Sequence, residues 1–357
     1  MKSRFLTALL GLTFSLAATG GEMTLPWPVS DNAVALAEGP DGPTLYSFLG
    51  IGSGKSFRDI ARFAASCPLK SGRCAALPDV PLPQGRLAGT AVMVGGKIYL
   101  FGGYSVSEDG TEVSNPEALA FDPNSGSWET KAPIPLPVDD SVSVAFRNRY
   151  VYLISGWHED ANTARVQVYD SVRNGWFEAT PFPGTPVFGH AGAIVGNHLL
   201  VTDGVAVLGK KPDGHNRYGL VDEAWAGEID PADPAKILWR RLPPHPGKPA
   251  YRMAAAASGN RVEFAGGAEN PYNYNGIGYD GVPSAPSARR FAYDFAAAHW
   301  IELADKKLPS MDHRGMLAAD GKLYILGGMV GGQEVTSRVQ SLDAASVISP
   351  AASSGSH

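Results

Sequence analysis

Short apolar segments recur along the chain, and each begins at a polar turn and ends at a glycine. They occupy residues 95–104, 148–157, 196–205, 259–268 and 320–329, and a fainter copy occupies residues 43–52. Apolar runs of this length between turn residues are typical of buried β-strands. The glycines that end the five clear copies follow at similar intervals: Gly103, Gly156, Gly204, Gly267 and Gly328. A recurrence of this kind predicts an array of similar sheets.

A tryptophan follows the glycine in four of the repeats and opens a further strand: Trp128, Trp176, Trp239 and Trp300. A period of about 50 residues with a glycine pair and a later tryptophan is typical of a kelch-type blade. We therefore predict an all-β fold, a six-bladed kelch-type β-propeller. The glycine pairs would let neighbouring sheets approach closely near the axis, and the tryptophans would fill the wider space between the outer parts of adjacent blades.

The N-terminal segment has the pattern of a secretory signal peptide. Lys2 and Arg4 precede an apolar run that ends in small residues and is too short to span a membrane. We predict a signal peptide at 1–20, the propeller at 21–349 and a flexible tail at 350–357, in a periplasmic or secreted protein without membrane insertion after cleavage. We expect residues 22–25, rather than residues 345–348, to supply the outer strand of the last blade, because no tryptophan follows Gly328.

Composition agrees with an exported β-protein. The chain has 42 Gly and 28 Pro but only 18% charged residues, which favours short strands with tight turns. A net charge of −5 without a basic run argues against a nucleic-acid partner. Cys67 and Cys74 are the only cysteines, and we expect them to form a local disulfide. No further ligands stand near them in the sequence, so we predict neither a metal nor a cofactor. The oligomeric state stays open.

Polar residues concentrate just before the first strand of each blade. In an antiparallel blade, this segment and the one after the glycine pair should lie on the same face, around the axis. Several cations and carboxylates there would suit a small acidic sugar or glycan. The alternative is that the arginines pair with neighbouring loops and stiffen the rim. The residues concerned are Arg86, Asp139, Asp140, His190, Arg252, His313 and Arg314.

The loops after the glycine pair are longest in blades four and five. From glycine to tryptophan they span 103–128 and 156–176 in blades two and three, but 204–239 and 267–300 in blades four and five. Long loops on a rigid scaffold often carry function. The last of these loops contains Tyr272, Tyr274 and Tyr279 among Asn and Gly. Aromatic faces and amide donors suit a sugar ring, although such a loop could also cover its own apolar base.

At these residues the chain resembles the exported bacterial kelch propellers of the N-acetylneuraminate epimerase family, which interconvert the anomers of sialic acid. The resemblance extends from Leu45 to Leu342. Its most specific parts are LYSFLGIGSG (45–54), PQGRLAGTAVMVGGKIYLFGGYSVSEDG (83–110), AENPYNYNGIGYDG (268–281) and LYILGGMVGGQEVTSRV (323–339). It implies a sialic acid-type mutarotase or epimerase, an isomerase of carbohydrate metabolism.

The sequence departs from that family at the residue implicated in catalysis. The resemblance implies a Glu directly after the blade-four glycine turn and an Arg a few residues later, but here Val205 follows the turn and Arg217 comes only after a gap. Opening a sugar ring needs a group that accepts a proton and one that donates it. The candidates for a catalytic set are Glu269, Arg217 and His190, with His215 and His313 as further possible bases. Arg217, Arg252 and Arg314 would then hold the carboxylate of the sugar.

Loss of the family's Glu favours a second hypothesis, a non-catalytic propeller that binds a carbohydrate or another protein. The retained blade-five loop fits either hypothesis, so the sequence leaves open whether the protein is an enzyme. A third class of kelch propeller, the copper-radical oxidases, needs a Tyr cross-linked to a Cys. Both cysteines of this chain lie in one short loop, where we expect them to bond each other, so the sequence argues against an oxidase.

Overall fold

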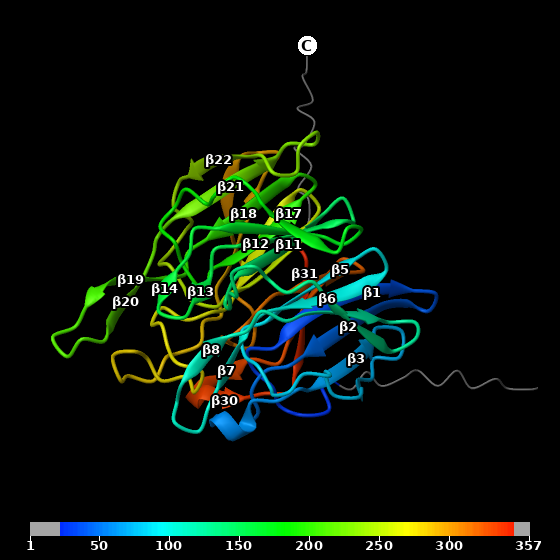
Figure 1. Ribbon diagram of the computed structural model, residues 1–357, viewed down its shortest axis with the longest axis horizontal. Helices are drawn as coiled ribbons and strands as arrows, with labels where there is room; N and C mark the ends of the chain where they lie inside the picture. The colour runs from blue at the N-terminus through cyan, green and yellow to red at the C-terminus, as the bar shows by residue number, and fades with distance from the viewer. Residues whose placement is uncertain (1–21, 346–357) are drawn as a thin grey trace, which may run out of the picture.

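The structure, a computed structural model, describes residues 22–345, so the predicted signal peptide and C-terminal tail lie outside the described residues. The chain forms an all-β propeller with six blades, as predicted (Figure 1). Within the described range, the 3-10 helices η1 (Phe57–Asp59) and η2 (Gly331–Gln333) interrupt the strands. No described helix is long and apolar enough to cross a membrane.

Each of the first five blades is an antiparallel sheet of four strands, ordered from the axis outwards. Blades one and two consist of β1 (Ala33–Gly39), β2 (Gly42–Phe48), β3 (Ala64–Pro68) and β4 (Ala75–Ala76), and of β5 (Thr90–Val94), β6 (Lys97–Phe101), β9 (Ala118–Asp122) and β10 (Ser127–Lys131). Blades three and four consist of β11 (Val142–Phe146), β12 (Tyr150–Ile154), β15 (Val166–Asp170) and β16 (Gly175–Glu178), and of β17 (Ala191–Val195), β18 (His198–Thr202), β21 (Ala224–Ile229) and β22 (Ile237–Leu242). Blade five consists of β23 (Ala254–Ser258), β24 (Arg261–Ala265), β25 (Arg290–Asp294) and β26 (His299–Leu303).

The sixth blade combines the two ends of the described chain and closes the ring. Its inner strands are β27 (Leu317–Ala319), β28 (Lys322–Leu326) and β31 (Val339–Asp343). Thr24 forms an antiparallel bridge with Arg338, and the Val339 N–H donates to the Met23 carbonyl at 2.9 Å. The predicted closure by residues 22–25 is therefore confirmed. Strand β27 in turn contacts β1, so the six innermost strands surround one axis.

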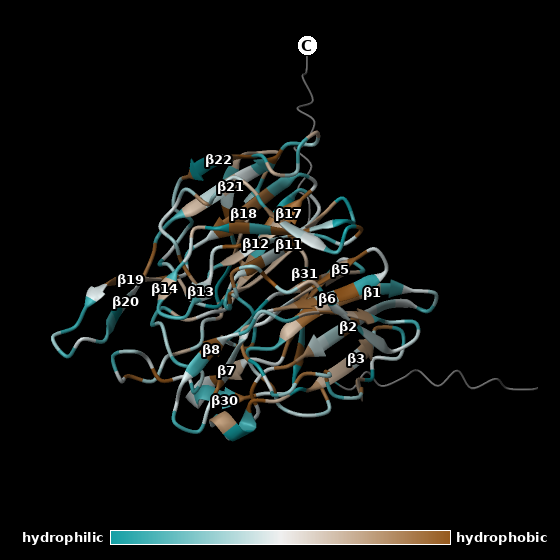
Figure 2. Ribbon diagram, viewed as in Figure 1, coloured by the Kyte–Doolittle hydropathy of each residue, from teal (hydrophilic) through white to brown (hydrophobic). Residues whose placement is uncertain are grey.

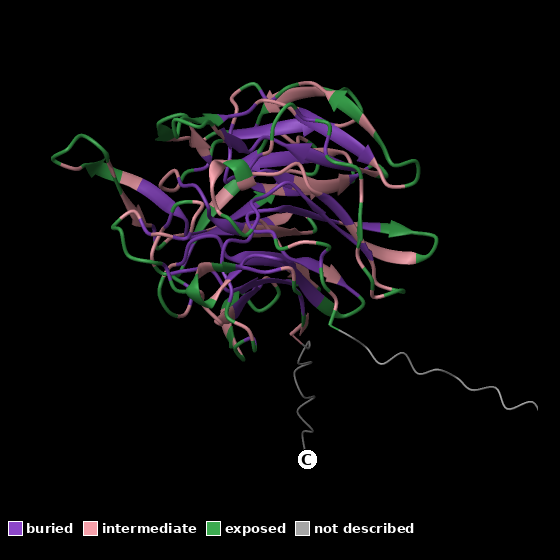
Figure 3. Ribbon diagram, turned by 90° about the horizontal axis from the view of Figure 1, so that it is seen from below, coloured by how far each residue is buried: buried purple, intermediate pink, exposed green. Residues whose placement is uncertain are grey.

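Apolar side chains from neighbouring blades form the core, which Figures 2 and 3 show as hydrophobic, buried strands inside a polar, exposed rim. The predicted role of the tryptophans is confirmed. Trp128 packs edge-on against Phe48 of the preceding blade, with ring centroids 5.5 Å apart. The Trp176 indole N–H donates to the Ala132 carbonyl at 2.9 Å, at the end of the preceding blade. Such tryptophans join two sheets through apolar burial and a hydrogen bond.

The glycine pairs permit two different close approaches. Gly103 has φ +82°, and a Cβ atom there would lie 2.5 Å from the Leu87 carbonyl oxygen of the segment that enters the same blade. A Cβ on Gly102 would meet the Val138 carbonyl of the segment that enters the next blade. One glycine therefore packs against its own blade and the other against its neighbour.

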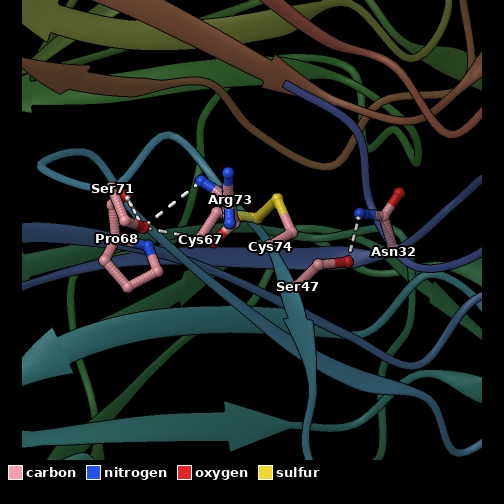
Figure 4. Close-up of a disulfide and its surroundings, with 7 residues drawn as sticks. All are labelled: Asn32, Ser47, Cys67, Pro68, Ser71, Arg73 and Cys74. Carbon is pink, nitrogen blue, oxygen red and sulfur yellow. Dashed lines mark hydrogen bonds between the residues drawn. A yellow bond between two sulfur atoms is a disulfide. The ribbon is translucent and has the colours of Figure 1, made fainter. Parts of the chain in front are cut away.

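Cys67 and Cys74 form a disulfide, shown in Figure 4. Cys67 belongs to β3 and Cys74 directly precedes β4. The bond clasps the loop between these two outer strands of blade one, where the Ser71 hydroxyl also donates to the Pro68 carbonyl at 3.2 Å.

The longer connections emerge on one face, which we call the loop face. It carries the hairpins β7 (Tyr104–Val106) with β8 (Glu112–Ser114), β13 (Trp157–His158) with β14 (Ala161–Asn162), β19 (Val205–Lys210) with β20 (Asn216–Leu220), and β29 (Met329–Val330) with β30 (Glu334–Val335). The β19–β20 hairpin projects furthest at the left of Figure 1. The segments that enter the blades pair with these extensions, for example Asp139 with Trp157 and Tyr251 with Ala268. The predicted meeting of the two kinds of segment is thus confirmed.

Candidate functional site

A ring of backbone turns surrounds the axis on the loop face. One residue at the entry to each blade has a φ between +52° and +67°: Asp31, Ala88, Asp140, Gly189, Arg252 and Asp312. Backbone hydrogen bonds join several of them around the axis, such as Gly189 N–H to the Asp140 carbonyl and Arg252 N–H to the Gly189 carbonyl. Since these turns are held from both sides, residues other than glycine persist in the left-handed region.

The charged members of this ring meet in a buried ionic cluster. We call Asp31, Asp140, Arg252, Asp312 and Arg314 the axial cluster. Arg252 Nε and Nη2 donate to the two carboxylate oxygens of Asp140 at 3.0 and 2.5 Å, and Nη1 donates to Asp312 Oδ1 at 2.7 Å. Arg314 Nη1 donates to Asp140 Oδ1 at 2.5 Å. At most 2% of each of these side chains is exposed.

The surroundings shift the pKa values of Asp31 and Asp140 in opposite directions. Burial raises the pKa of Asp31 well above its ordinary value, and its like-charged neighbours Asp312 and Asp140 add to the rise against the opposing effect of Arg252. Burial also acts against the charge of Asp140, but Arg252 and Arg314 outweigh it and lower the pKa of that carboxyl. The two guanidinium groups thus share the buried cluster with three carboxyl groups, of which Asp31 holds its proton more tightly than an ordinary aspartate.

Beneath the axial cluster runs a channel of about 310 Å³, lined by the innermost strands. His190 and His313 stand at its upper end. His190 Nε2 bonds the Ile154 carbonyl at 2.9 Å, and His313 Nε2 bonds the Ser310 hydroxyl at 2.8 Å. Burial lowers the pKa of each to about 3, so both imidazoles are neutral near pH 7. Both face the channel beneath the cluster.

Beside the cluster, a small cleft opens on the loop face, and we call it the aromatic cleft. Its water-accessible volume is about 90 Å³. The side chains come from the entry segments of blades three to five and from the extensions after the glycine turns of blades two to five. They are Tyr104, Glu112, Asp139, Asp140, Trp157, Phe188, Tyr218, Arg252, Tyr272, Asn273, Tyr274 and Tyr279.

The walls of this cleft are aromatic rings that brace one another. Tyr218 of the β19–β20 hairpin lies against Tyr279 of the blade-five loop, with centroids 4.3 Å apart. Trp157 and Phe188 pack edge-to-face at 5.3 Å. Tyr272 is fully buried, and its hydroxyl has no hydrogen-bond partner within residues 22–345. A buried hydroxyl without a partner costs free energy, so it marks a position where a ligand could bond.

Two carboxyl groups in the cleft titrate abnormally. Burial and the negative charge of Asp140 raise the pKa of Asp139 well above its ordinary value, although the Ser114 hydroxyl donates to its Oδ2 at 2.6 Å. Glu112 lies at the mouth, where the residue is exposed to solvent. The surrounding walls nevertheless raise its pKa; the positive charge of Arg252 opposes this rise, and the negative charge of Asp140 adds to it. Carboxyls with raised pKa values in a cleft are candidates for proton transfer.

The structure brings together only part of the set considered from the sequence. Asp140, Arg252, Tyr272, Tyr274 and Tyr279 line the cleft. Arg314 belongs to the axial cluster, and His190 and His313 lie at the channel.

The other candidates lie elsewhere. Arg86 is buried against Glu117, with Nη2 and Oε2 2.7 Å apart, and also donates to the Gly102 carbonyl. Glu269 is half exposed and pairs with Lys248 at 3.2 Å. Arg217 is exposed and donates to the Leu208 carbonyl at 2.7 Å. Each of these residues therefore has a partner elsewhere, and none of them lines the cleft. Val205, which follows the blade-four turn, is fully buried in an apolar cluster with Phe188 and Tyr251.

Sequence reasoning missed Asp31, Asp312, Glu112 and Tyr218. Asp31 and Asp312 occupy the same place in their entry segments as Asp140 and Arg252, so an alignment of all six entry segments would have found them. Glu112 and Tyr218 lie on hairpins that project over the mouth, and nothing in their local sequence marks them.

One group of side chains has the spacing of a metal site. Single oxygen or nitrogen atoms of Asp203, Asp222 and His245 lie within 4.8 Å of one another. However, Asp203 already bonds His245 Nε2 and accepts from the Ala250 N–H, at 2.8 and 2.7 Å. Asp203 and His245 therefore already satisfy each other as a hydrogen-bonded pair, and this pair fixes the segment that enters blade five.

No family model matches the sequence. The chain is 29% identical over 128 residues to Kelch-like protein 15 of Gallus gallus, which is 36% of this chain and 25% of that protein. It thus spans about a quarter of the length of that relative. It is 25% identical over 286 residues to N-acetylneuraminate epimerase 1 of Escherichia coli O6:H1, which is 67% of this chain and 71% of that protein. The solved structure of YjhT matches 90% of this chain and 99% of that chain, with a TM-score of 0.70 and 16% identity. These likenesses agree with a kelch-type six-bladed propeller.

Proposed function

We propose that this protein binds a sugar in the aromatic cleft and interconverts its anomers. The observation that carries the proposal is the pair Asp139 and Glu112, two carboxyls with raised pKa values in a cleft walled by aromatic rings. Aromatic faces provide a stacking surface for the C–H side of a sugar ring. The similarity to a protein named N-acetylneuraminate epimerase supports a sugar as the ligand.

The two carboxyls would divide the proton transfers. Asp139, which is buried and holds its proton more tightly than an ordinary aspartate, would donate that proton to the ring oxygen as the bond from the anomeric carbon to that oxygen breaks. Glu112 would accept the proton of the anomeric hydroxyl, and the open-chain carbonyl forms. Rotation about the bond next to this carbonyl and reclosure, with both protons returned, give the other anomer. The raised pKa of Glu112 makes it a stronger base than a free carboxylate.

Exchange spectroscopy by NMR tests this proposal. We expect catalytic amounts of protein to accelerate exchange between the anomeric signals of a panel of free sugars that includes sialic acid. Glu112→Gln and Asp139→Asn should each reduce the acceleration by about 100-fold or more, as expected for the loss of a general acid or base. Glu159→Gln is the control, because Glu159 is exposed on the loop face at the turn of the β13–β14 hairpin.

Three other outcomes would change the assignment. Loss of acceleration in Glu269→Gln but not in Glu112→Gln would move the base to Glu269. Acceleration that survives all these changes but not the loss of a histidine would assign the base to that histidine. Binding without acceleration would select the second candidate function, a carbohydrate-binding propeller, which the apolar burial of Val205 favours.

We also propose that the protein works outside the cytoplasm. The disulfide in blade one and the N-terminal pattern of charged, apolar and small residues support this location. Cell fractionation of the full chain and mass determination of its mature N-terminus test it. Recovery of the uncleaved chain in the cytoplasm, with both thiols reduced, would contradict it.

A further inference from the structure

We propose that the aromatic cleft prefers a ligand with a positive charge, and that the sugar it takes is a protonated amino sugar. The substrate class rests on the proposed function, whereas the preference for a cation rests on the cleft itself. The inference is carried by carboxyls that lie next to aromatic faces without a cation of their own among residues 22–345.

The charges around the cleft do not suit an anion. Among the described residues that line it, Arg252 is the only cationic side chain, and Asp140 and Asp312 already accept hydrogen bonds from its Nε, Nη1 and Nη2. A ligand carboxylate would have to displace an aspartate that is itself buried. Glu112 and Asp139 are further carboxyls in the same cleft. A cation beside Glu112 would gain that carboxylate as a charged partner, while the buried Asp139 keeps the proton that the proposed reaction uses.

The aromatic walls favour a cation by a second mechanism. The face of an aromatic ring is negative and attracts an ammonium or guanidinium group within about 6 Å of its centroid. Arg252 already uses two rings in this way, with its guanidinium carbon 4.9 Å from the centroid of Tyr251 and 5.8 Å from that of Tyr272. Trp157, Tyr218 and Tyr279 line the cleft as well. They offer rings of the kind found in ammonium-binding cages.

A third observation marks the place for a polar ligand group. The Tyr272 hydroxyl is buried and has no partner in the described part of the chain. A sugar hydroxyl that reached it on binding would accept its hydrogen bond, while an amine would pair with Glu112, which is exposed to solvent. Burial raises the pKa of Tyr272, so the hydroxyl keeps its proton.

A separate groove beyond Tyr218 and Tyr279 has the opposite character. It is lined by Lys210, Lys211 and His215 of the β19–β20 hairpin, and Lys211 Nζ donates to the Tyr279 carbonyl at 3.0 Å. An anionic ligand would find its partners there rather than in the cleft. Mutations in the cleft and in this lysine groove therefore distinguish binding of a cation from binding of an anion.

Titration calorimetry at pH 6.5 with three matched sugars tests the inference: glucosamine, which is protonated, N-acetylglucosamine, which is neutral, and glucuronic acid, which is ionised. We expect glucosamine to bind about tenfold more tightly than either of the others, the size of one cation–π contact or charged hydrogen bond. Glu112→Gln should reduce this preference to about threefold or less, and Glu159→Gln should keep it. Equal or tighter binding of the neutral or ionised sugar would overturn the inference, and loss of glucuronic acid binding in Lys210→Gln would move the ligand to the lysine groove.

The same panel separates this inference from the proposed function. Preferential binding of glucosamine without faster anomer exchange would support the cation preference and contradict the isomerase. Faster exchange of all three sugars at equal affinity would support the isomerase and contradict the cation preference.

Discussion

The axial cluster and the aromatic cleft share Asp140 and Arg252 but differ in how their charges are paired. In the cluster, carboxylates and guanidinium groups from blades one, three, five and six pair with one another, and at most 2% of each side chain is exposed. In the cleft, within the part of the chain that the structure describes, Glu112 and Asp139 have no cation of their own and the Tyr272 hydroxyl lacks a partner. The charges of the cluster thus have partners of opposite sign within the protein, although both Asp31 oxygens and Arg314 Nε lack a hydrogen-bond partner among the described residues. The carboxyls of the cleft lack such an ion pair, so a ligand could supply one.

This difference separates two meanings of converging charge in a propeller. Charged residues at the entry of each blade necessarily approach the axis, since the blades surround it. They indicate a ligand site only where their charges lack a partner of opposite sign. Arg252 and Arg314 suggested a carboxylate-binding pocket in the sequence, but their aspartate partners make them an internal clamp between blades.

The largest effect should come from breaking this clamp. Arg252→Met leaves the buried Asp312 without the guanidinium group that bonds it, so we expect a loss of about 3–5 kcal/mol in the free energy of unfolding, measured with urea. Arg217→Met is the matched control, because this arginine is exposed on a hairpin. The urea concentration at the midpoint of unfolding should be almost the same for this variant as for the wild type. If the Arg252→Met variant does not fold, Arg252→Lys should give a soluble protein of intermediate stability. Equal stability of Arg252→Met and the wild type would refute the clamp.

A smaller effect should follow from the protonated member of the cluster. Asp31 binds its proton more tightly in the folded protein than in the unfolded chain, so the wild type should lose stability as the pH rises from about 4 toward the folded pKa. Asp31→Asn cannot ionise and should escape that loss. We expect the difference in the free energy of unfolding between variant and wild type to grow in favour of the variant as the pH rises from 5 to 8. A constant difference across this range would mean that Asp31 does not titrate there.

The smallest effect on stability should come from the cleft. Tyr272→Phe removes a buried hydroxyl that has no partner among the described residues, so we expect a change of less than about 1 kcal/mol, in the stabilising direction. Tyr152→Phe is the matched control: its hydroxyl donates to the Pro234 carbonyl at 2.7 Å, and its loss should cost about 1 kcal/mol. The two variants should rank the other way in sugar affinity, because Tyr272→Phe should weaken the sugar complex and Tyr152→Phe should not. A destabilised Tyr272→Phe would show that the hydroxyl is already satisfied.

Much of the architecture follows from local sequence. The glycine pairs and the tryptophans recur in order because the blades repeat the same close approaches and the same joint to a neighbour. Gly103 and Trp176 therefore reveal the packing mode without any knowledge of distant contacts. No tryptophan follows Gly328, whereas Trp27 stands where the outer strand of a blade would end, and these two features predicted closure by the N-terminal residues, which the bridge between Thr24 and Arg338 confirms.

The site follows from the sequence only in part. The tyrosines of the blade-five loop were identified because their composition is unusual for a turn, and all three line the cleft. Glu112 was not, because an acidic residue on an exposed hairpin is ordinary until its neighbours are known. Glu269 and Arg217 were chosen for their distance from a glycine turn, but distance along the chain does not fix the direction of a side chain.

The sequence by itself determined the repeat, the number of blades, the face that carries the long loops and the residue types available there. Only the tertiary structure decided which of those charges neutralise one another and which stay open to a ligand. The physical reason is that pairing depends on side chains from blades far apart in the chain, since Arg252 of blade five meets Asp31 of blade one and Asp140 of blade three. Repeats specify each blade locally, whereas the charges around the axis are balanced only when the ring is closed.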